Sequence, residues 1–391
     1  MRLLAGLLLT LSAPAAAQVS SVAVEFDRRA VRPVLAEGLA DRVSQRAVTA
    51  DDPVRVASIS KLFTALGVMR LVDAGVLDLD RDVSEYLGWP LRHPAYPDAP
   101  ITLRMLLSHR SGLSDGGERY IVPLGETLRA RLQDARVWDP LAPPGSDRFA
   151  YTNLNFPVVA SVMEAATGER FDRLVRRTVF APLGVDACFN WSGCSTRAIE
   201  RAVVLYRADG SVARDDLGGQ PPQCMVVPAS DGTCDLTGYR PGSNGSLFSP
   251  QGGVRISMRD LAKVGRLMVR QGRGFISRRA FMEMTDPAWR LSGDNGRDEA
   301  GQPGGIFCAY GLAVHRIGSG AAGCRDDLFG DGRARIGHSG EAYGLRSGLW
   351  LDPRTGKGIA FFTTAVPEDA PKGASGFTLR EEELVRRAAD R

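Results

Sequence analysis

The sequence predicts an α+β protein in which one antiparallel sheet is built from both ends of the chain, with an all-helical part inserted between them. Alternating apolar and polar residues, typical of strands, occur at residues 19–26 and 30–36, around a short polar turn. Strand patterns of comparable strength return only after residue 311. The middle third of the chain instead shows helical patterns with helix start and stop residues. We therefore expect helices to flank the sheet and to form a second part beside it.

The chain of 391 residues begins with features of a secretory signal peptide at residues 1–17. Arg2 precedes an apolar run at residues 3–11, and small residues follow up to Gln18. That run is too short to span a bilayer, and no later stretch approaches 18 apolar residues. We expect a periplasmic or secreted protein without a membrane anchor. Net charge is +4, and arginines are scattered among acidic residues, which argues against nucleic-acid binding.

Six cysteines fit an exported chain, and they fall into three pairs of near neighbours. The number of possible connectivities for six cysteines is 15. A zinc site would need Cys-x-x-Cys spacing or nearby histidines, and the cysteines have neither. We therefore expect disulfides, with no metal and no cofactor. The predicted pairs are Cys188–Cys194, Cys224–Cys234 and Cys308–Cys324.

The elements are expected in the following order. Helices are predicted at residues 55–74, 102–107, 155–166, 170–180 (closed by Pro182) and 257–271, and strands at 311–317, 333–337, 348–352 and 358–364. Thr378 and Glu381 form a capping box for a last helix that reaches the C-terminus. After the signal peptide, residues 18–391 are expected to form one functional unit. Its α/β part comprises 18–75 and 254–391, its helical part 76–187, and a disulfide-stapled insertion 188–253.

Ser58 and Lys61 stand three residues apart at the start of the first predicted helix, so they share one face of it. Of the 49 Lys and Arg residues only four are lysines, so a lysine at this position is informative. A buried lysine can lose its proton, whereas a guanidinium cannot. Ser58 is thus a candidate nucleophile and Lys61 its base. Alone, a Ser-x-x-Lys spacing also arises by chance.

Two further stretches carry residue types that such a nucleophile needs. Tyr151 and Asn153 are two residues apart in an extended segment and would project together, one as a proton donor and one as an amide partner. The alternative is a core tyrosine followed by a helix-capping asparagine. The second stretch is His338-Ser339-Gly340, at the entry to the last strand pair. A lone histidine there is also compatible with a structural role.

Together these three motifs, in this order, resemble the serine β-lactamase-related family, which includes class C β-lactamases, D-Ala-D-Ala carboxypeptidases and esterases. Four further stretches also resemble sequences typical of this family: residues 106–113, 75–80, 181–184 and 249–253. The resemblance covers roughly residues 38–364 and implies a β-lactamase/transpeptidase-like fold with a cleft between its two parts.

By the same resemblance, Ser58 is acylated, Lys61 is its base or proton relay, and Tyr151 passes a proton to the leaving group. Asn153, His338, Ser339 and Gly340 would contact substrate, and the backbone N–H groups of Ser58 and Glu341 would form the oxyanion hole. The third motif differs from the Lys-Thr-Gly of class C β-lactamases. If His338 faces the cleft, its charge would favour carboxylate-bearing substrates in mild acid.

The function expected is therefore an exported serine hydrolase acting on an ester, amide or peptide bond of a small molecule or peptide. Two alternatives stay open: a catalytically silent, penicillin-binding-like module that binds cell-wall peptide, and a true β-lactamase or D-Ala-D-Ala carboxypeptidase. An intact set of Ser58, Lys61 and Tyr151 argues against the silent module. The oligomeric state stays open.

Overall fold

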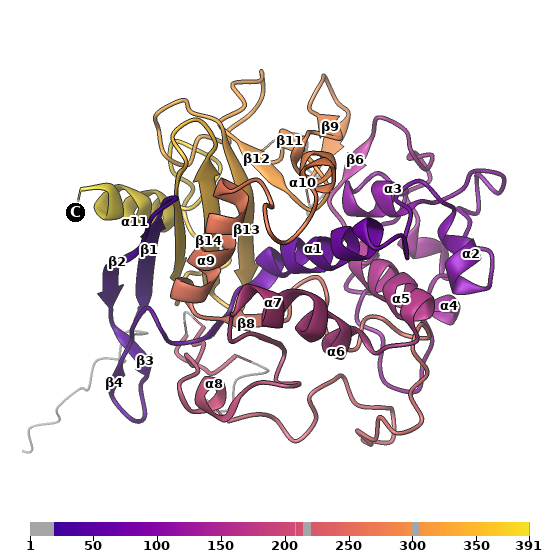
Figure 1. Ribbon diagram of the computed structural model, residues 1–391, viewed down its shortest axis with the longest axis horizontal. Helices are drawn as coiled ribbons and strands as arrows, with labels where there is room; N and C mark the ends of the chain where they lie inside the picture. Colours follow the sequence, from indigo (N-terminus) through magenta and orange to yellow (C-terminus); the bar gives the residue numbers. More distant parts are fainter. Residues whose placement is uncertain (1–18, 208, 214–219, 299–304, 391) are drawn as a thin grey trace, which may run out of the picture.

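The computed structural model describes residues 19–207, 209–213, 220–298 and 305–390 (Figure 1). Its largest element is an eight-stranded antiparallel sheet in the order β2-β1-β15-β14-β13-β12-β11-β9. The strands are β1 (Ser21–Phe26), β2 (Val31–Glu37), β9 (Trp289–Arg290), β11 (Ala309–Tyr310), β12 (His315–Ile317), β13 (Arg335–Ala342), β14 (Leu345–Asp352) and β15 (Lys357–Thr363). The predicted signal peptide, residues 1–17, lies outside the described residues.

Strands from the first and the last part of the chain pair next to one edge of this sheet. Strand β1, near the N-terminus, pairs antiparallel with β15, near the C-terminus, so that Val24 lies opposite Ala360. This pairing confirms the predicted sheet from both termini. Because consecutive side chains along a strand point to opposite faces of the sheet, its two faces carry different residues.

Each face of the sheet is covered by one helix. Strand residues Val22, Val24, Ala360 and Phe362 belong to the same apolar cluster as Leu261 and Val264 of α9 (Met258–Val269). Their sequence neighbours Ala23, Ile359 and Phe361 belong to a second cluster with Leu384 and Val385 of α11 (Leu379–Ala389). The α11 helix begins with the predicted capping box of Thr378 and Glu381. Figure 1 shows α9 and α11 lying along this sheet.

Phe26 sets how closely α9 approaches the sheet. A Cβ atom placed on Gly265 of α9, or on Gly358 of β15, would lie 2.2 Å from the Phe26 ring. Only glycine leaves room for the ring at these two positions, so the helix packs directly against the strands.

The second part of the molecule is helical and lies on the other side of α1 (Figure 1). The remaining helices are α1 (Ser60–Asp73), α2 (Val83–Leu87), α3 (Leu103–Leu107), α4 (Leu128–Arg131), α5 (Asn155–Thr167), α6 (Phe171–Val175), α7 (Ala181–Leu183), α8 (Thr196–Glu200) and α10 (Arg278–Thr285), with short helical turns at Ala57–Ile59, Ala135–Val137 and Arg176–Phe180. Short strands form three small ladders: β3 (Leu39–Asp41) with β4 (Arg46–Ala47), β6 (Phe149–Ala150) with β10 (Gly296–Arg297), and β5 (Val54–Arg55) and β7 (Cys188–Phe189) with β8 (Val254–Ile256).

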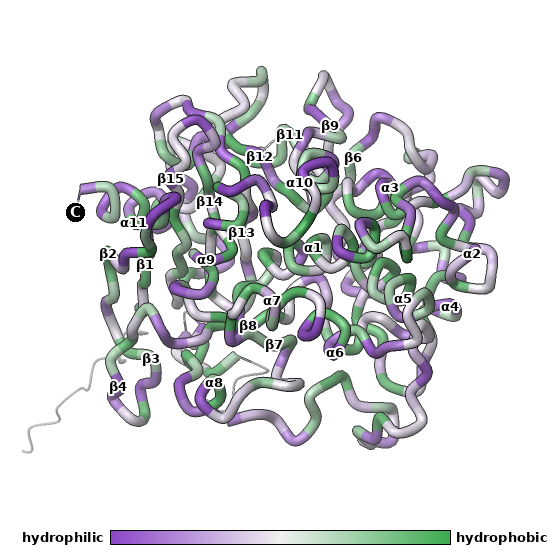
Figure 2. The backbone as a smooth tube through the Cα atoms, viewed as in Figure 1, coloured by the Kyte–Doolittle hydropathy of each residue, from purple (hydrophilic) through white to green (hydrophobic). Residues whose placement is uncertain are grey.

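Helix α1 is buried on nearly all sides, as its apolar sequence predicts. In Figure 2 its trace is mostly hydrophobic, while hydrophilic segments gather in peripheral loops. The helix ends at Ala74, and Gly75 follows with a left-handed φ of 70°. This buried helix connects the sheet side to the helical side, so residues at its N-terminus lie where the two parts meet.

Three predicted elements differ from the structure. The helix predicted at residues 55–74 begins later, because Arg55 lies in β5 and α1 starts at Ser60 after the turn Ala57–Ile59. The helical run at residues 171–183 continues past Pro182, which occupies the first turn of α7, and ends at Gly184 with a left-handed φ of 61°. Proline fits there because a first-turn residue donates no intrahelical hydrogen bond. Of the predicted strand 311–317, only His315–Ile317 is a strand, β12; residues 311–314 form the turn of the hairpin that joins it to β11, with Ala313 at φ 55°.

The three predicted disulfides are confirmed, with Cα–Cα distances of 5.0 Å for Cys188–Cys194, 5.5 Å for Cys224–Cys234 and 6.0 Å for Cys308–Cys324. Two of them lie within residues 188–253, whose described part contains little regular structure beyond β7 and α8. The boundaries proposed for the three parts of the chain stay a prediction. Within the described ranges, no helix combines the length and the apolar character that crossing a membrane requires.

Candidate active site

Ser58 lies in a tight helical turn, Ala57–Ile59, directly before α1. The residues on either side of it are buried, whereas Ser58 itself is partly exposed. Ala57 has a left-handed φ of 48°, which is uncommon for a residue with a Cβ atom. Such backbone strain persists only where the surrounding structure imposes it. The turn therefore presents one hydroxyl from an otherwise buried segment.

Lys61 lies one turn later, and none of its surface is exposed. Its Nζ lies 2.9 Å from Ser58 Oγ, 2.7 Å from Asn153 Oδ1 and 3.2 Å from the backbone oxygen of Gln251. A neutral amine has two N–H donors and one lone pair. Two carbonyl acceptors and one hydroxyl donor match that set, so the contacts are compatible with Lys61 accepting the Ser58 proton.

Asn153 is held by a residue that the sequence analysis did not identify. Its Nδ2 donates to Asp115 Oδ2 at 2.9 Å, and the backbone N–H of Leu154 donates to Asp115 Oδ1 at 2.9 Å. Burial raises the pKa of Asp115, while these two donors and the charge of Lys61 act in the opposite direction. Asp115 thus fixes the amide so that its oxygen faces Lys61.

Tyr151 contributes the third predicted side chain, and it is 5% exposed. Lys61 Nζ lies 4.8 Å from the centroid of the Tyr151 ring. The structure therefore brings Ser58, Lys61, Tyr151 and Asn153 together from two segments of the chain, the start of α1 and the residues just before α5. Ser58 Oγ and the Tyr151 ring thus both lie near Lys61 Nζ, the oxygen at 2.9 Å and the ring centroid at 4.8 Å.

Strand β13 packs its Gly340 against the Ser58 turn. A Cβ atom on Gly340 would lie 2.3 Å from Val56 O, 2.4 Å from Ser347 Oγ and 3.3 Å from Ser58 N. The close approach puts the backbone around Gly340 beside the Ser58 amide, where the predicted oxyanion hole would form. Ser339 is partly exposed, and the exposed Glu341 pairs with Arg346 at 2.6 Å.

His338 departs from the prediction that it carries a charge in mild acid. None of its surface is exposed, and burial followed by the nearby charge of Lys61 holds its pKa well below 6.5. Its Nδ1 lies 2.5 Å from Ser339 O and its Nε2 lies 2.7 Å from the Tyr310 hydroxyl. A neutral ring satisfies both contacts, with Nδ1 donating and Nε2 accepting. The ring lies 6.3 Å from that of Tyr151, next to the site but closed off from solvent.

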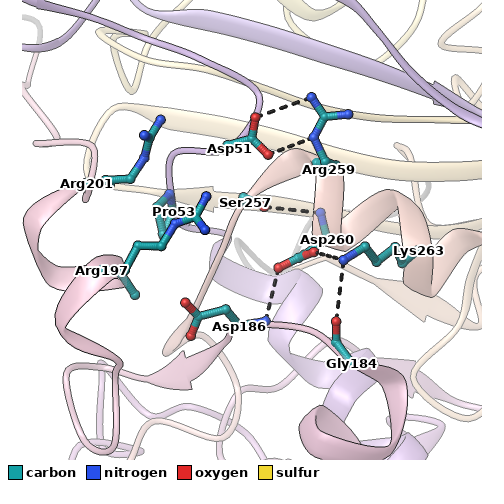
Figure 3. Close-up of a pocket in the computed structure, with 11 residues that line it drawn as sticks. Asp51, Pro53, Gly184, Asp186, Arg197, Arg201, Ser257, Arg259, Asp260 and Lys263 are labelled. Carbon is teal, nitrogen blue, oxygen red and sulfur yellow. Dashed lines mark hydrogen bonds and ion pairs between the residues drawn. The ribbon is translucent and has the colours of Figure 1, made fainter.

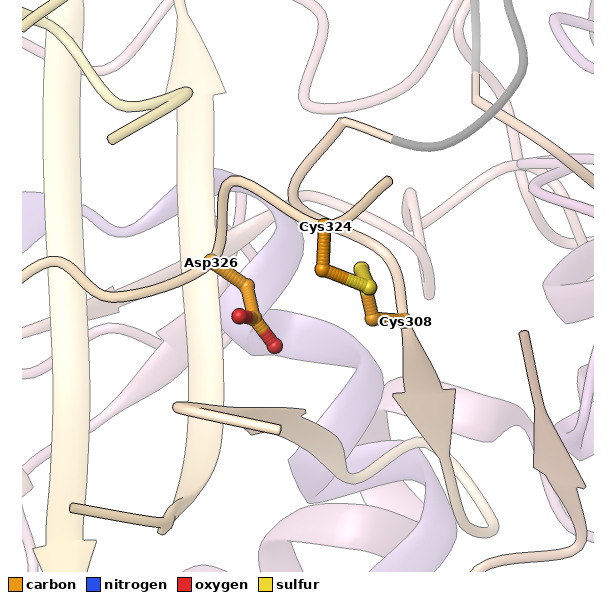
Figure 4. A group of neighbouring side chains, drawn as sticks. All are labelled: Cys308, Cys324 and Asp326. Atoms are coloured by element: carbon orange, nitrogen blue, oxygen red, sulfur yellow. A yellow bond between two sulfur atoms is a disulfide. The ribbon is translucent and has the colours of Figure 1, made fainter. Parts of the chain in front are cut away.

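A group of three potential metal ligands lies outside this site. Cys308, Cys324 and Asp326 bring their ligand atoms within 4.8 Å of one another, but Figure 4 shows the two sulfur atoms joined as a disulfide. Disulfide sulfurs are not thiolate ligands, so this group does not hold a metal in its oxidised form.

A polar cavity of about 260 Å³ lies between α8 and α9 (Figure 3). Three of its cations are already paired: Arg259 with Asp51, Lys263 with Asp260, and Arg201 with the buried Asp52. Its lining does not include Ser58 or Lys61. The cavity is therefore separate from the candidate active site.

Comparisons with known proteins identify the family of the chain. The family model described as "Beta-lactamase" matches residues 15–378. Esterase EstB of Burkholderia gladioli is 36% identical over 192 residues, 44% of this chain and 46% of the relative. The D-alanyl-D-alanine-carboxypeptidase/endopeptidase AmpH of Escherichia coli is 33% identical over 142 residues, 34% of this chain and 36% of the relative. The chain thus spans less than half the length of these curated relatives.

Solved structures match over nearly the whole chain. D-amino acid amidase from Ochrobactrum anthropi has a TM-score of 0.66 and 21% identity, covering 96% of this chain and 93% of the amidase. A class C beta-lactamase from Rhodobacter sphaeroides has a TM-score of 0.65 and 18% identity, covering 96% of this chain and 94% of the β-lactamase. At these identities the likeness shows a shared fold, and it confirms the fold predicted from the motifs.

Proposed function

This chain belongs to the β-lactamase family, and we propose that it is a serine hydrolase that forms an acyl-enzyme on Ser58. The observation that carries the proposal is the fully buried Lys61, whose Nζ lies 2.9 Å from Ser58 Oγ. Burial disfavours a charged ammonium, so an amine in this place is suited to take a proton. The acceptors Asn153 Oδ1 and Gln251 O orient the amine toward the serine.

In the proposed acylation, Ser58 Oγ attacks the carbonyl carbon of the substrate while Lys61 takes the hydroxyl proton. The carbonyl oxygen becomes negatively charged, and the backbone N–H groups of Ser58 and Glu341 stabilise it. When the bond to the leaving group breaks, Tyr151 donates a proton to that group and is reprotonated through Lys61. Water then attacks the acyl-enzyme, which releases the acid and restores Ser58.

The proposed substrates contain an ester, amide or peptide bond in a small molecule or peptide. The similar proteins include an esterase, a carboxypeptidase and an amidase, and this range supports the substrate class without selecting among its members. A neutral His338 supports substrates that do not depend on a cation there. We further propose that the protein is exported, which three disulfides support because they persist in oxidising compartments.

The test is covalent labelling with a fluorophosphonate, read by intact mass and peptide mapping. We expect a single adduct on Ser58. Ser58→Ala removes one oxygen, so it should fold, fail to react and lose all turnover. Ser44→Ala, which removes an exposed hydroxyl elsewhere, is the matched control and should react normally. An adduct on another residue, or turnover by Ser58→Ala, would refute the proposal.

A further inference from the structure

His109 contacts the chain on both sides of Tyr151. Its backbone oxygen accepts a hydrogen bond from Ala150 N at 3.0 Å, and its Nδ1 accepts one from Thr152 N at 2.9 Å. Its ring stacks on the ring of Tyr151, with centroids 4.4 Å apart and planes inclined by 23°. The residue before Tyr151, the residue after it and the Tyr151 ring are thus all held by His109.

His109 does not use its ring for proton transfer in this arrangement. It is 1% exposed, and burial followed by the charge of Lys61 holds its pKa well below 6.5. Because Nδ1 accepts from Thr152, the proton of the neutral ring is on Nε2. Nε2 is buried and has no hydrogen-bond partner within the described part of the chain. The His109 ring therefore acts on the Tyr151 segment by stacking and by accepting a hydrogen bond at Nδ1.

Phe307 covers the opposite face of Tyr151. Its ring centroid lies 4.5 Å from that of Tyr151, and the planes are inclined by 23°. Offset stacking on both faces restricts how the phenol ring can tilt. Cys308, the next residue, is tied to Cys324, which holds this second ring in place.

We infer that His109 is a positioning residue that holds the Tyr151 phenol where it can protonate the leaving group. The inference rests on the proposed function, since it concerns the proton donor of that mechanism. A displacement of about 1 Å can cost roughly 10²-fold in rate. Such a loss should fall on poor leaving groups, which need a proton to depart, and spare good ones, which do not.

Two substitutions test separately the stacking of the His109 ring and the hydrogen bond that its Nδ1 accepts. His109→Asn keeps an acceptor at the Nδ1 position and suits the left-handed φ of 56°, but it removes the ring. His109→Phe keeps a ring and removes the acceptor. His93→Asn is the matched control, because His93 is equally buried, its Nδ1 accepts from Ala95 N at 3.1 Å, and its ring packs on Trp138 instead.

The experiment measures kcat and KM for a p-nitrophenyl ester and for an alkyl ester of the same acid, after counting active sites with the fluorophosphonate. For His109→Asn we expect kcat to fall by about 10²-fold on the alkyl ester and by less than about fivefold on the p-nitrophenyl ester, with KM nearly unchanged. His109→Phe should restore the ratio of the two rates to within about threefold of the unmodified protein. His93→Asn should leave that ratio unchanged.

The inference would be overturned if His109→Asn left the ratio of the two rates unchanged, or if His93→Asn lowered the alkyl-ester rate selectively as well. If His109→Asn does not fold, Phe307→Leu tests the same point from the opposite face and should also lower the alkyl ester selectively; a flat ratio there overturns it. Tyr151→Phe distinguishes a failure of the proton-donor role of Tyr151 from a failure of the positioning role of His109. A flat ratio in Tyr151→Phe removes the proton-donor role itself, whereas a selective loss in Tyr151→Phe without one in His109→Asn refutes only the role of His109.

Discussion

Gly340→Ala should damage the site through one methyl group. The new Cβ would lie 2.3 Å from Val56 O and 2.4 Å from Ser347 Oγ, about 1 Å inside ordinary contact. Gly340 does not have a left-handed φ, so the substitution adds volume without backbone strain. The Ser347 hydroxyl can rotate away, but the Val56 carbonyl belongs to the backbone that leads into Ser58. Strand β13 and the Ser58 turn must therefore separate.

A separation of about 1 Å corresponds to roughly a 10²-fold loss of kcat, or about 2.7 kcal/mol of transition-state stabilisation. Overpacking should also lower the free energy of unfolding by about 1–3 kcal/mol. The assay is kcat with a p-nitrophenyl ester, together with urea denaturation. Adding Ser347→Ala to Gly340→Ala should not restore the rate, because the contact with Val56 O remains.

Gly238→Ala is the matched control, since a Cβ atom there would have no heavy atom within 4 Å. It should change neither kcat nor stability measurably. The reasoning is refuted if Gly340→Ala keeps kcat within about threefold, or if the added Ser347→Ala recovers the lost activity. Either result would mean that β13 does not press on the Ser58 turn as the structure shows.

Three further predictions concern charge. Lys61→Arg should be about as inactive as Lys61→Ala in ester hydrolysis, because a guanidinium stays protonated; a near-normal rate would rule out the base role. Burial, opposed by hydrogen bonds from Tyr239, Gly242 and Phe171, raises the pKa of Glu164 from 4.5 to about 7. The folded state thus binds this proton more tightly, so a contribution of about 3 kcal/mol, complete below pH 4.5, should be lost as pH rises through about 7. Urea denaturation from pH 4 to 8 should show that fall, and Glu164→Gln should remove most of it; an unchanged slope in the variant would contradict the assignment. Since His338 is neutral, the ratio of kcat/KM for a carboxylate-bearing ester to that for a neutral ester should stay flat between about pH 6 and 8. A steep fall of that ratio near pH 6.5 would show instead that His338 is charged and reachable.

Much of the fold and part of the site follow from local sequence. The hairpin of β1 and β2, helix α1 with Gly75 after it, and the capping box of α11 each depend on residues close together in the chain. The disulfides were predictable for the same reason, because each closes a short loop. Ser58 and Lys61 belong to this class too, since a spacing of three residues at a helix start brings their side chains together.

Tertiary structure decided the surroundings of those residues. The carbonyl of Gln251 contacts Lys61 directly, and Asp115 acts on it through Asn153. A backbone oxygen has no signature in sequence, and nothing around Asp115, which precedes two loop glycines, marks it as the partner of Asn153. His109 was visible as part of a family phrase, yet its stacking on Tyr151 depends on how two distant segments pack.

His338 shows most directly why local sequence does not determine the charge or the exposure of a side chain. Its residue type suggested a group that titrates near neutral pH, and the predicted strand 333–337 ended just before it, whereas β13 continues through it to Ala342. Whether such a ring faces solvent or the interior depends on strand register and on what covers that face. Here Tyr310 and the Ser339 carbonyl enclose it, so burial outweighs its intrinsic affinity for a proton. Sequence determined which chemical groups are present, and long-range packing determined which of them carry charge and which reach the substrate.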